Sequence, residues 1–125
     1  MDDDTIHELF AVLQPISIRR MFGGKGIYAG GRIFALMLND ELYLKTDAQT
    51  AFCFEAAGSR RWTYQREGAA PVAMPYHSVP DEALDDPDLM ADWARLAMEA
   101  AIRHGTKKPP RRSTGPAASR TSQID

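Results

Sequence analysis

Apolar residues near the start of the chain recur with the spacing of a helix. Four of them fall on one helical face, namely Ile6, Leu9, Phe10 and Leu13. Thr5 and Glu8 have the spacing of a capping box, in which each side chain accepts a hydrogen bond from a backbone N–H that the helix start leaves free. Pro15 ends the pattern, because the residue before a proline is pushed out of helical geometry. The sequence therefore predicts a helix over residues 4–14.

From residue 16 to residue 45 the apolar positions form short runs separated by turn residues. Gly30-Gly31 is a two-residue hairpin turn in which both residues can adopt positive φ, and Asn39-Asp40 marks the next turn. The run over residues 33–38 is apolar at successive positions, which predicts a central strand covered on both faces. We expect three or four antiparallel strands in this part of the chain.

The second half of the chain is predicted to begin with a short helix and two strands. Asp47 caps a helix that ends at Gly58. Two strands follow, over residues 61–65 and 71–77. Prolines in the second strand cannot donate a hydrogen bond to a sheet ladder, so we place that strand at the edge of the sheet.

A long final helix has the clearest boundaries. Asp86 is its N-cap, Pro87 occupies its first position, and the helix closes near Gly105. Its buried stripe is predicted to consist of Leu89, Trp93, Leu96 and Ala100. The order of elements is thus helix, three or four strands, helix, two strands, helix. This order predicts an α+β fold of two layers, in which helices pack on an antiparallel sheet.

Charge divides the chain of 125 residues into an acidic body and a basic tail. Residues 1–103 carry 10 Lys/Arg and 16 Asp/Glu, whereas residues 104–125 carry 5 Lys/Arg and 1 Asp. Beyond Gly105 the only large aliphatic residue is Ile124, which buries too little surface to offset chain entropy. We therefore expect one domain over residues 1–105 and a disordered basic Pro/Arg/Ser tail over residues 106–125.

Three features of the sequence indicate a cytoplasmic protein. Cys53 is the only cysteine, so neither an internal disulfide nor a cysteine-based zinc cluster can form. The first residues are acidic, unlike the basic start of a signal peptide. The longest apolar runs are too short to span a bilayer, so we expect no membrane segment.

The stretch Gly23-Gly24-Lys25-Gly26 is the most suggestive local motif. Glycine-rich loops bind phosphates through backbone N–H groups, and a lysine such as Lys25 adds charge. However, the spacing of a phosphate-binding loop and the helix that should follow it are both missing. We therefore favour a bulge or tight turn that requires positive φ, with anion binding as the alternative.

No catalytic, metal or cofactor site can be assembled from the remaining residues. The three histidines are far apart and are expected at the surface: His7, His77 and His104. Cys53 lies between two phenylalanines and has no neighbouring base. Five aromatic residues can stack nucleic-acid bases if they share an exposed face, but packing in the core or in a subunit interface is the preferred interpretation: Tyr28, Tyr43, Trp62, Tyr64 and Tyr76.

Residues 20–28 resemble the opening signature of the TfoX N-terminal domain family. They read Arg20-Met21-Phe22-Gly23-Gly24-Lys25-Gly26-Ile27-Tyr28, and later matches over residues 34–36, 42–47, 79–84 and 89–101 follow in the family's order. The resemblance implies a two-layer fold related to the secretion-chaperone-like group. In some members it implies a co-activator of DNA-uptake genes that works with a cyclic-AMP receptor protein. We expect the signature residues Met21, Phe22, Gly23, Gly24 and Gly26 to form a structural turn.

The sequence favours a non-enzymatic regulatory domain that binds a protein partner, with a transcription regulator as the expected class of partner. The partner would meet an exposed sheet edge or a homodimer face. The main alternative is weak nucleic-acid binding through the tail, because phosphate contacts need clustered cations: Lys107, Lys108, Arg111 and Arg112, with Lys25 as a further anion contact. A stand-alone domain of unrelated role, or a small-molecule groove between sheet and helices, is the remaining interpretation.

Overall fold

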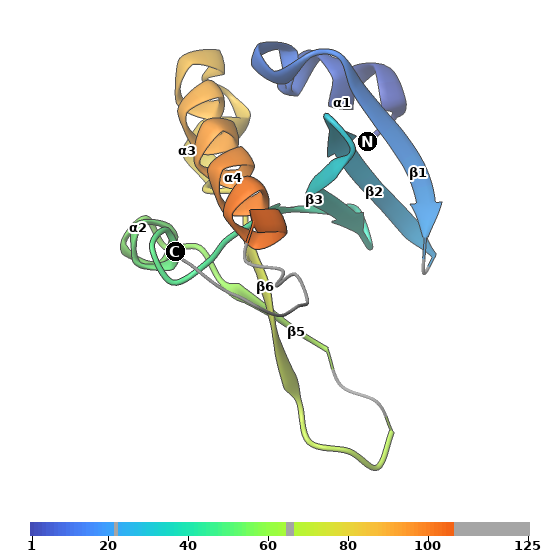
Figure 1. Ribbon diagram of the computed structural model, residues 1–125, viewed down its shortest axis with the longest axis vertical. Coiled ribbons are helices and arrows are strands. Elements are labelled where there is room, and N and C mark those ends of the chain that lie inside the picture. The colour runs from blue at the N-terminus through green and yellow to red at the C-terminus, as the bar shows by residue number, and fades with distance from the viewer. Residues whose placement is uncertain (22, 65–66, 107–125) are drawn as a thin grey trace, which may run out of the picture.

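The computed structural model describes residues 1–21, 23–64 and 67–106. Six antiparallel strands form one sheet, and the helices pack against one of its faces (Figure 1). This arrangement confirms the predicted α+β class. Phe22 of the expected signature and the tail beyond Thr106 lie outside the described residues.

The first four strands form a meander, as predicted. Their bounds are β1 Ile16–Met21, β2 Gly24–Ala29, β3 Arg32–Leu38 and β4 Glu41–Lys45. Both predicted turns are confirmed by their backbone angles: φ is 58° at Gly30 and 80° at Gly31, and it is 51° at Asn39 and 62° at Asp40. Positive φ at both turn residues matches the twist of the strands, which is why such turns close tight hairpins.

Strand β3 carries one extra residue opposite β2. Ile27 pairs with Ala35, whereas Tyr28 pairs with Ile33, so Phe34 has no partner of its own in β2. The bulge turns Phe34 toward the helices next to Ala35, and both residues are fully buried. The bulge also places Ile33 opposite Tyr28, on the other face of the sheet.

The expected position of the proline-containing strand was wrong. The sheet order is β1-β2-β3-β4-β6-β5, so β6 (Val72–Ser78) lies inside the sheet and β5 (Arg61–Tyr64) forms the edge. Pairing of β6 with β4 ends at Tyr76, and the register with β5 shifts where Pro75 lies. Pro75 therefore needs no N–H there, and its carbonyl accepts a hydrogen bond from the Thr46 N–H.

The first helix, α1 (Asp3–Leu9), begins earlier than predicted and continues as a 3₁₀ turn, η1 (Ala11–Leu13). The expected capping box was wrong. The N-cap is Asp2, whose carboxylate accepts a hydrogen bond from the Thr5 N–H at 2.8 Å, so Thr5 lies inside the first turn. A carboxylate is a strong acceptor at this position and also interacts favourably with the helix dipole.

Three further helices complete the helical layer: α2 Ala51–Ala56, α3 Asp81–Leu84 and α4 Pro87–Thr106. The short helix α3 was not predicted. Asp86 caps α4 as expected, since its carboxylate accepts hydrogen bonds from the N–H groups of Asp88 and Leu89. Only one member of the predicted stripe, Ala100, is among the buried residues of this helix, which are Met90, Ala94, Ala97, Ala100 and Ala101. The small alanines let α4 lie close to β3 and β4, which leaves Leu89, Trp93 and Leu96 at the margins.

Aromatic rings fill the space between the helices and the sheet. Phe10 packs edge-on against Phe34, with ring centroids 4.9 Å apart. Phe54 of α2 lies 4.6 Å from Trp93 of α4, measured between centroids. Trp93 thus contributes to the core as expected, although from its margin.

Candidate functional site

The glycine-rich signature lies in the β1–β2 hairpin. Gly23 is in the turn with φ of 76°, whereas Gly24 and Gly26 lie in β2. A Cβ atom on Gly24 would be 2.2 Å from the carbonyl oxygen of Met37, and one on Gly26 would be 2.7 Å from the sulfur of Met21. The turn is thus shorter than the stretch of glycines suggested. Gly24 and Gly26 instead belong to β2, where the lack of a side chain lets Met37 and Met21 lie close to the backbone.

Lys25 lies in β2 and is held by the helical layer. Its ammonium group is 2.5 Å from a carboxylate oxygen of Asp3 in α1. Anion binding by Lys25 stays a prediction, and the four tail cations proposed for nucleic acid lie outside the described residues: Lys107, Lys108, Arg111 and Arg112.

His77 is fully buried, so its expected surface position was wrong. Its Nδ1 lies 2.9 Å from the Thr46 hydroxyl, its Nε2 lies 3.0 Å from a Glu55 carboxylate oxygen, and its ring packs beside Phe54. Hydroxyl, imidazole and carboxylate thus stand in the order of a hydrolytic triad. Thr46 is itself fully buried, so its hydroxyl is closed to solvent, and the three side chains join α2 to the sheet.

Asp47 links the start of α2 to the end of α4. Its carboxylate accepts hydrogen bonds from the N–H groups of Gln49 and Thr50, and two Arg103 nitrogens donate to it at 2.6 and 3.1 Å. The Arg103 guanidinium holds the pKa of this carboxyl below its usual range, with help from the backbone donors. Asp47 was expected to cap α2 directly, but it orders the turn before that helix.

Five aromatic side chains gather on the sheet face that the helices leave open, and we call this surface the aromatic face: Tyr28, Tyr43, Trp62, Tyr64 and Tyr76. The Trp62 ring is central, with centroids 6.1 Å from Tyr43 and 6.3 Å from both Tyr64 and Tyr76. Tyr64 is 49% exposed, whereas Tyr76 is buried by its neighbours. Burial, and secondarily the nearby Tyr28, raises the pKa of Tyr76 to about 12, so its hydroxyl stays neutral. The residues share one face, which the sequence had left open.

A cavity of about 550 Å³ opens on the aromatic face. It is lined by Gly23, Leu38 and Met74 together with Tyr43, Trp62 and Tyr64. The β1–β2 turn, the end of β3 and the β5–β6 hairpin therefore meet around one hollow. Its volume lies within the range of sites for small ligands.

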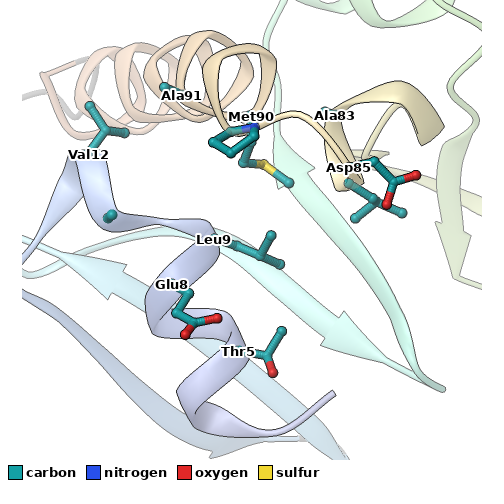
Figure 2. A pocket seen from close by; sticks show the side chains of 11 residues that line it. Thr5, Glu8, Leu9, Val12, Ala83, Asp85, Met90 and Ala91 are labelled. Atoms are coloured by element: carbon teal, nitrogen blue, oxygen red, sulfur yellow. The ribbon is translucent and has the colours of Figure 1, made fainter.

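The helical layer carries a second hollow, which we call the helical groove (Figure 2). It lies between α1–η1 on one side and α3–α4 on the other, with a volume of about 370 Å³. Leu9 and Met90 point into it, and Val12 and Ala83 lie at its sides (Figure 2). Glu8 and Asp85 add carboxylates to this apolar lining.

Sequence comparison identifies the family. The family model of the TfoX N-terminal domain matches residues 8–101, from α1 to the second half of α4. The chain belongs to the TfoX N-terminal domain family. The resemblance expected from the sequence is thereby confirmed. Among curated proteins the comparison finds no match.

The TfoX N-terminal domain separates its charges between the two layers. Helices α1–α4 contain nine acidic residues and two basic ones, Arg95 and Arg103. The strands contain one acidic residue, Glu41, and six basic ones: Arg19, Arg20, Lys25, Arg32, Lys45 and Arg61. The helical layer is therefore acidic and the sheet is basic, a difference that the net charge of the domain does not show.

The described part of the TfoX N-terminal domain contains neither a cluster of metal-binding side chains nor a membrane-spanning helix. No group of three or more His, Cys, Asp or Glu side chains in residues 1–21, 23–64 and 67–106 is arranged to hold a metal ion. None of the described helices combines the length and apolar character needed to cross a bilayer.

Proposed function

We propose that this TfoX N-terminal domain is a non-enzymatic regulatory domain that binds a basic, amphipathic segment of a protein partner in the helical groove. The observation that carries the proposal is an apolar groove built from two segments of chain that contain acidic residues but no Lys or Arg. Resemblance to co-activators of DNA-uptake genes supports a transcription regulator as the class of partner.

Apolar surface in the groove is available for docking. Val12 is 39% exposed and Leu84 is 42% exposed, and both line the same hollow as Leu9 and Met90. Covering such side chains removes apolar surface from water, which favours association. An amphipathic helix that lays its apolar face into a groove between helices is a recurrent mode of peptide recognition.

The charges around the groove select the other face of the partner segment. Residues 1–18 contain four acidic residues and residues 79–91 contain five, and neither segment contains Lys or Arg. Carboxylates at the rim steer a basic partner toward the groove and disfavour an acidic one. A partner segment with apolar residues on one face and Lys or Arg on the other therefore fits best.

Photo-crosslinking in cells tests this proposal directly. A photoreactive amino acid is placed at one of two groove positions, Val12 or Leu84, or at Ile102 on α4. Ile102 is the control, because it is 42% exposed, as Leu84 is. We expect the same protein adduct from Leu84 and from Val12, and no such adduct from Ile102. Equal adducts at Leu84 and Ile102, or no adduct at either groove position, would refute the groove as the binding site.

A second measurement separates charge at the groove from charge elsewhere. Glu8→Gln with Asp85→Asn removes two rim carboxylates, and Asp92→Asn with Glu99→Gln removes two carboxylates from α4 with the same change of net charge. We expect only the first pair to reduce the adduct. A synthetic peptide with leucines on one helical face and lysines on the other should compete with the adduct in the parent protein.

A further inference from the structure

The aromatic face combines flat rings with cations that have no carboxylate partner. The Arg19 guanidinium lies over the Tyr28 ring, 5.0 Å from its centroid, and the Lys45 ammonium lies over the Tyr76 ring at 5.1 Å. Among the described residues, neither cation forms an ion pair with Asp or Glu. Both cations therefore lie over aromatic rings rather than beside carboxylates.

Lys45 is the more unusual of the two. The residue is only 5% exposed, and burial lowers the pKa of its amine. A charge removed from water without a counter-charge is costly, and such a cost is offset when an anion binds nearby. The acidic residue of the strands, Glu41, is already engaged, because its carboxylate binds Arg60 and accepts a hydrogen bond from Tyr43. The face thus offers positive charge that the fold leaves uncompensated.

The exposed rings lie beside the cavity. Trp62 and Tyr64 line it from the edge strand β5, and Tyr43 lines it from β4. These rings come from β4 and β5, the two strands that flank β6, and with an open volume beside them they can stack against planar groups. The hairpin that carries Trp62 and Tyr64 projects from the body of the molecule, as Figure 1 shows, so a long ligand can pass along it.

We propose that the aromatic face binds single-stranded nucleic acid, with bases stacked on Trp62 and Tyr64 and phosphates held near Arg19 and Lys45. This inference goes beyond the proposed function, since it uses the face of the sheet opposite the helical groove. A ligand that alternates planar rings with negative charges matches both kinds of group on this face. A second copy of the chain fits less well, because it would bring a second set of unpaired cations into the same interface.

Fluorescence anisotropy with the full chain and labelled 12-nucleotide probes tests the proposal. The probes are a DNA strand, an RNA strand of the same sequence, and the corresponding DNA duplex. We expect the parent to bind at least one single strand at low salt, more tightly than the duplex, and binding should weaken as salt rises. The DNA and RNA arms then show which single strand is preferred. Failure to bind either strand, or equally tight binding of the duplex, would overturn stacking on this face.

Two pairs of matched variants assign the binding to the face. Tyr64→Ala removes a ring that is 49% exposed, and its control, Phe52→Ala, removes a ring on α2 that is 66% exposed. Arg19→Gln and Arg20→Gln remove the same charge from adjacent positions of β1, which face opposite sides of the sheet. We expect Tyr64→Ala and Arg19→Gln each to raise Kd roughly fivefold or more, the loss typical of one stacked base or one charged contact. Each control should stay within about twofold of the parent by the same scale.

The remaining outcomes are also decisive. Changing Lys107, Lys108, Arg111 and Arg112 to Gln in the full chain tests the tail. If this change abolishes binding while Tyr64→Ala and Arg19→Gln have no effect, the tail binds and the proposal is wrong. It is equally wrong if the members of each matched pair weaken binding alike. Sedimentation completes the test: a dimer of the parent that Tyr64→Ala dissociates would make the aromatic face a subunit interface.

Discussion

The two faces of the sheet are built from the same strands but differ in almost every property. Toward the helices the strands present mostly buried apolar side chains, and three phenylalanines fill the space: Phe10, Phe34 and Phe54. Away from the helices they present the aromatic face, where most rings keep part of their surface in solvent. Alternation along a strand therefore lets one sheet present a packed face on one side and a partly solvent-exposed aromatic face on the other.

Charge follows the same division. The helices that cover the packed face of the sheet contain mostly acidic residues, whereas the strands contain mostly basic ones. A single value of net charge averages the two and predicts neither surface. Packing and charge in this domain thus depend on which layer a residue occupies, and the following variants test that division.

The largest effect is expected from the packed face. Phe54→Ala should lower the free energy of unfolding by about 4 kcal/mol, because it deletes a fully buried ring and leaves a cavity. Tyr64→Ala on the aromatic face should cost less than about 1 kcal/mol, since half of that ring is already in water. Urea unfolding of both variants provides the measurement. Similar losses at the two positions would show that the aromatic face also supports the fold.

The hairpin glycines should be the next most sensitive positions. Gly24→Ala places a methyl group against the Met37 carbonyl and should cost roughly 3 kcal/mol, the upper range for overpacking. Gly23→Ala meets open space but holds positive φ, so about 1 kcal/mol is expected. Thermal unfolding should rank the two variants in that order, and the reverse ranking would contradict the close approach of β2 to β3.

Asp47 should contribute a pH-dependent stability to the helical side. Asp47→Ala removes an acceptor for two backbone N–H groups and for Arg103, at a cost of about 2 kcal/mol at neutral pH. Because the folded-state pKa of Asp47 is lowered, its contribution is complete above the unfolded-state value of about 3.9 and is lost as the pH falls through the folded-state value. Urea unfolding at pH 7 and pH 3 should therefore show a smaller difference between parent and variant at pH 3.

The smallest expected effect has the opposite sign and lies on the open side. Lys45→Met replaces an unpaired, nearly buried ammonium with an apolar group of similar shape and should raise the free energy of unfolding by about 1 kcal/mol. The folded-state pKa of Lys45 is lowered, so the unfolded chain holds more protons and the parent gains stability as the pH rises. The advantage of Lys45→Met should thus shrink between pH 7 and pH 10. A loss of stability at pH 7 would mean that the ammonium stabilises the native fold.

Local signals in the sequence identified most of the elements. The glycine and asparagine turns, the cap at Asp86 and the apolar run of β3 each depend on residues close together in the chain. The failures also have local causes. Asp2 replaced Thr5 as the N-cap because a stronger acceptor stood three residues earlier. Helix α3 is a single turn of four residues, too short for a periodic pattern to reveal.

The candidate surfaces depended on information that the sequence does not carry in any one segment. The family signature marked the β1–β2 hairpin, yet neither groove nor cavity is formed by that hairpin alone. The helical groove needs η1 and α3 to meet, although Val12 and Leu84 are far apart in the chain. His77 could have been recognised as buried only by knowing that β6 pairs with β4, because that pairing places it opposite Leu44.

The sequence by itself determined the family, the α+β class and the sites of the tight turns. These properties follow from periodicity and from the conformational preferences of single residues, which act over a few positions. Only the tertiary structure decided that β5 rather than β6 forms the edge and that five aromatic residues share one face. Pairing between strands distant in the chain fixes both, because a change of partner or a register shift of one residue would move each side chain to a different surface.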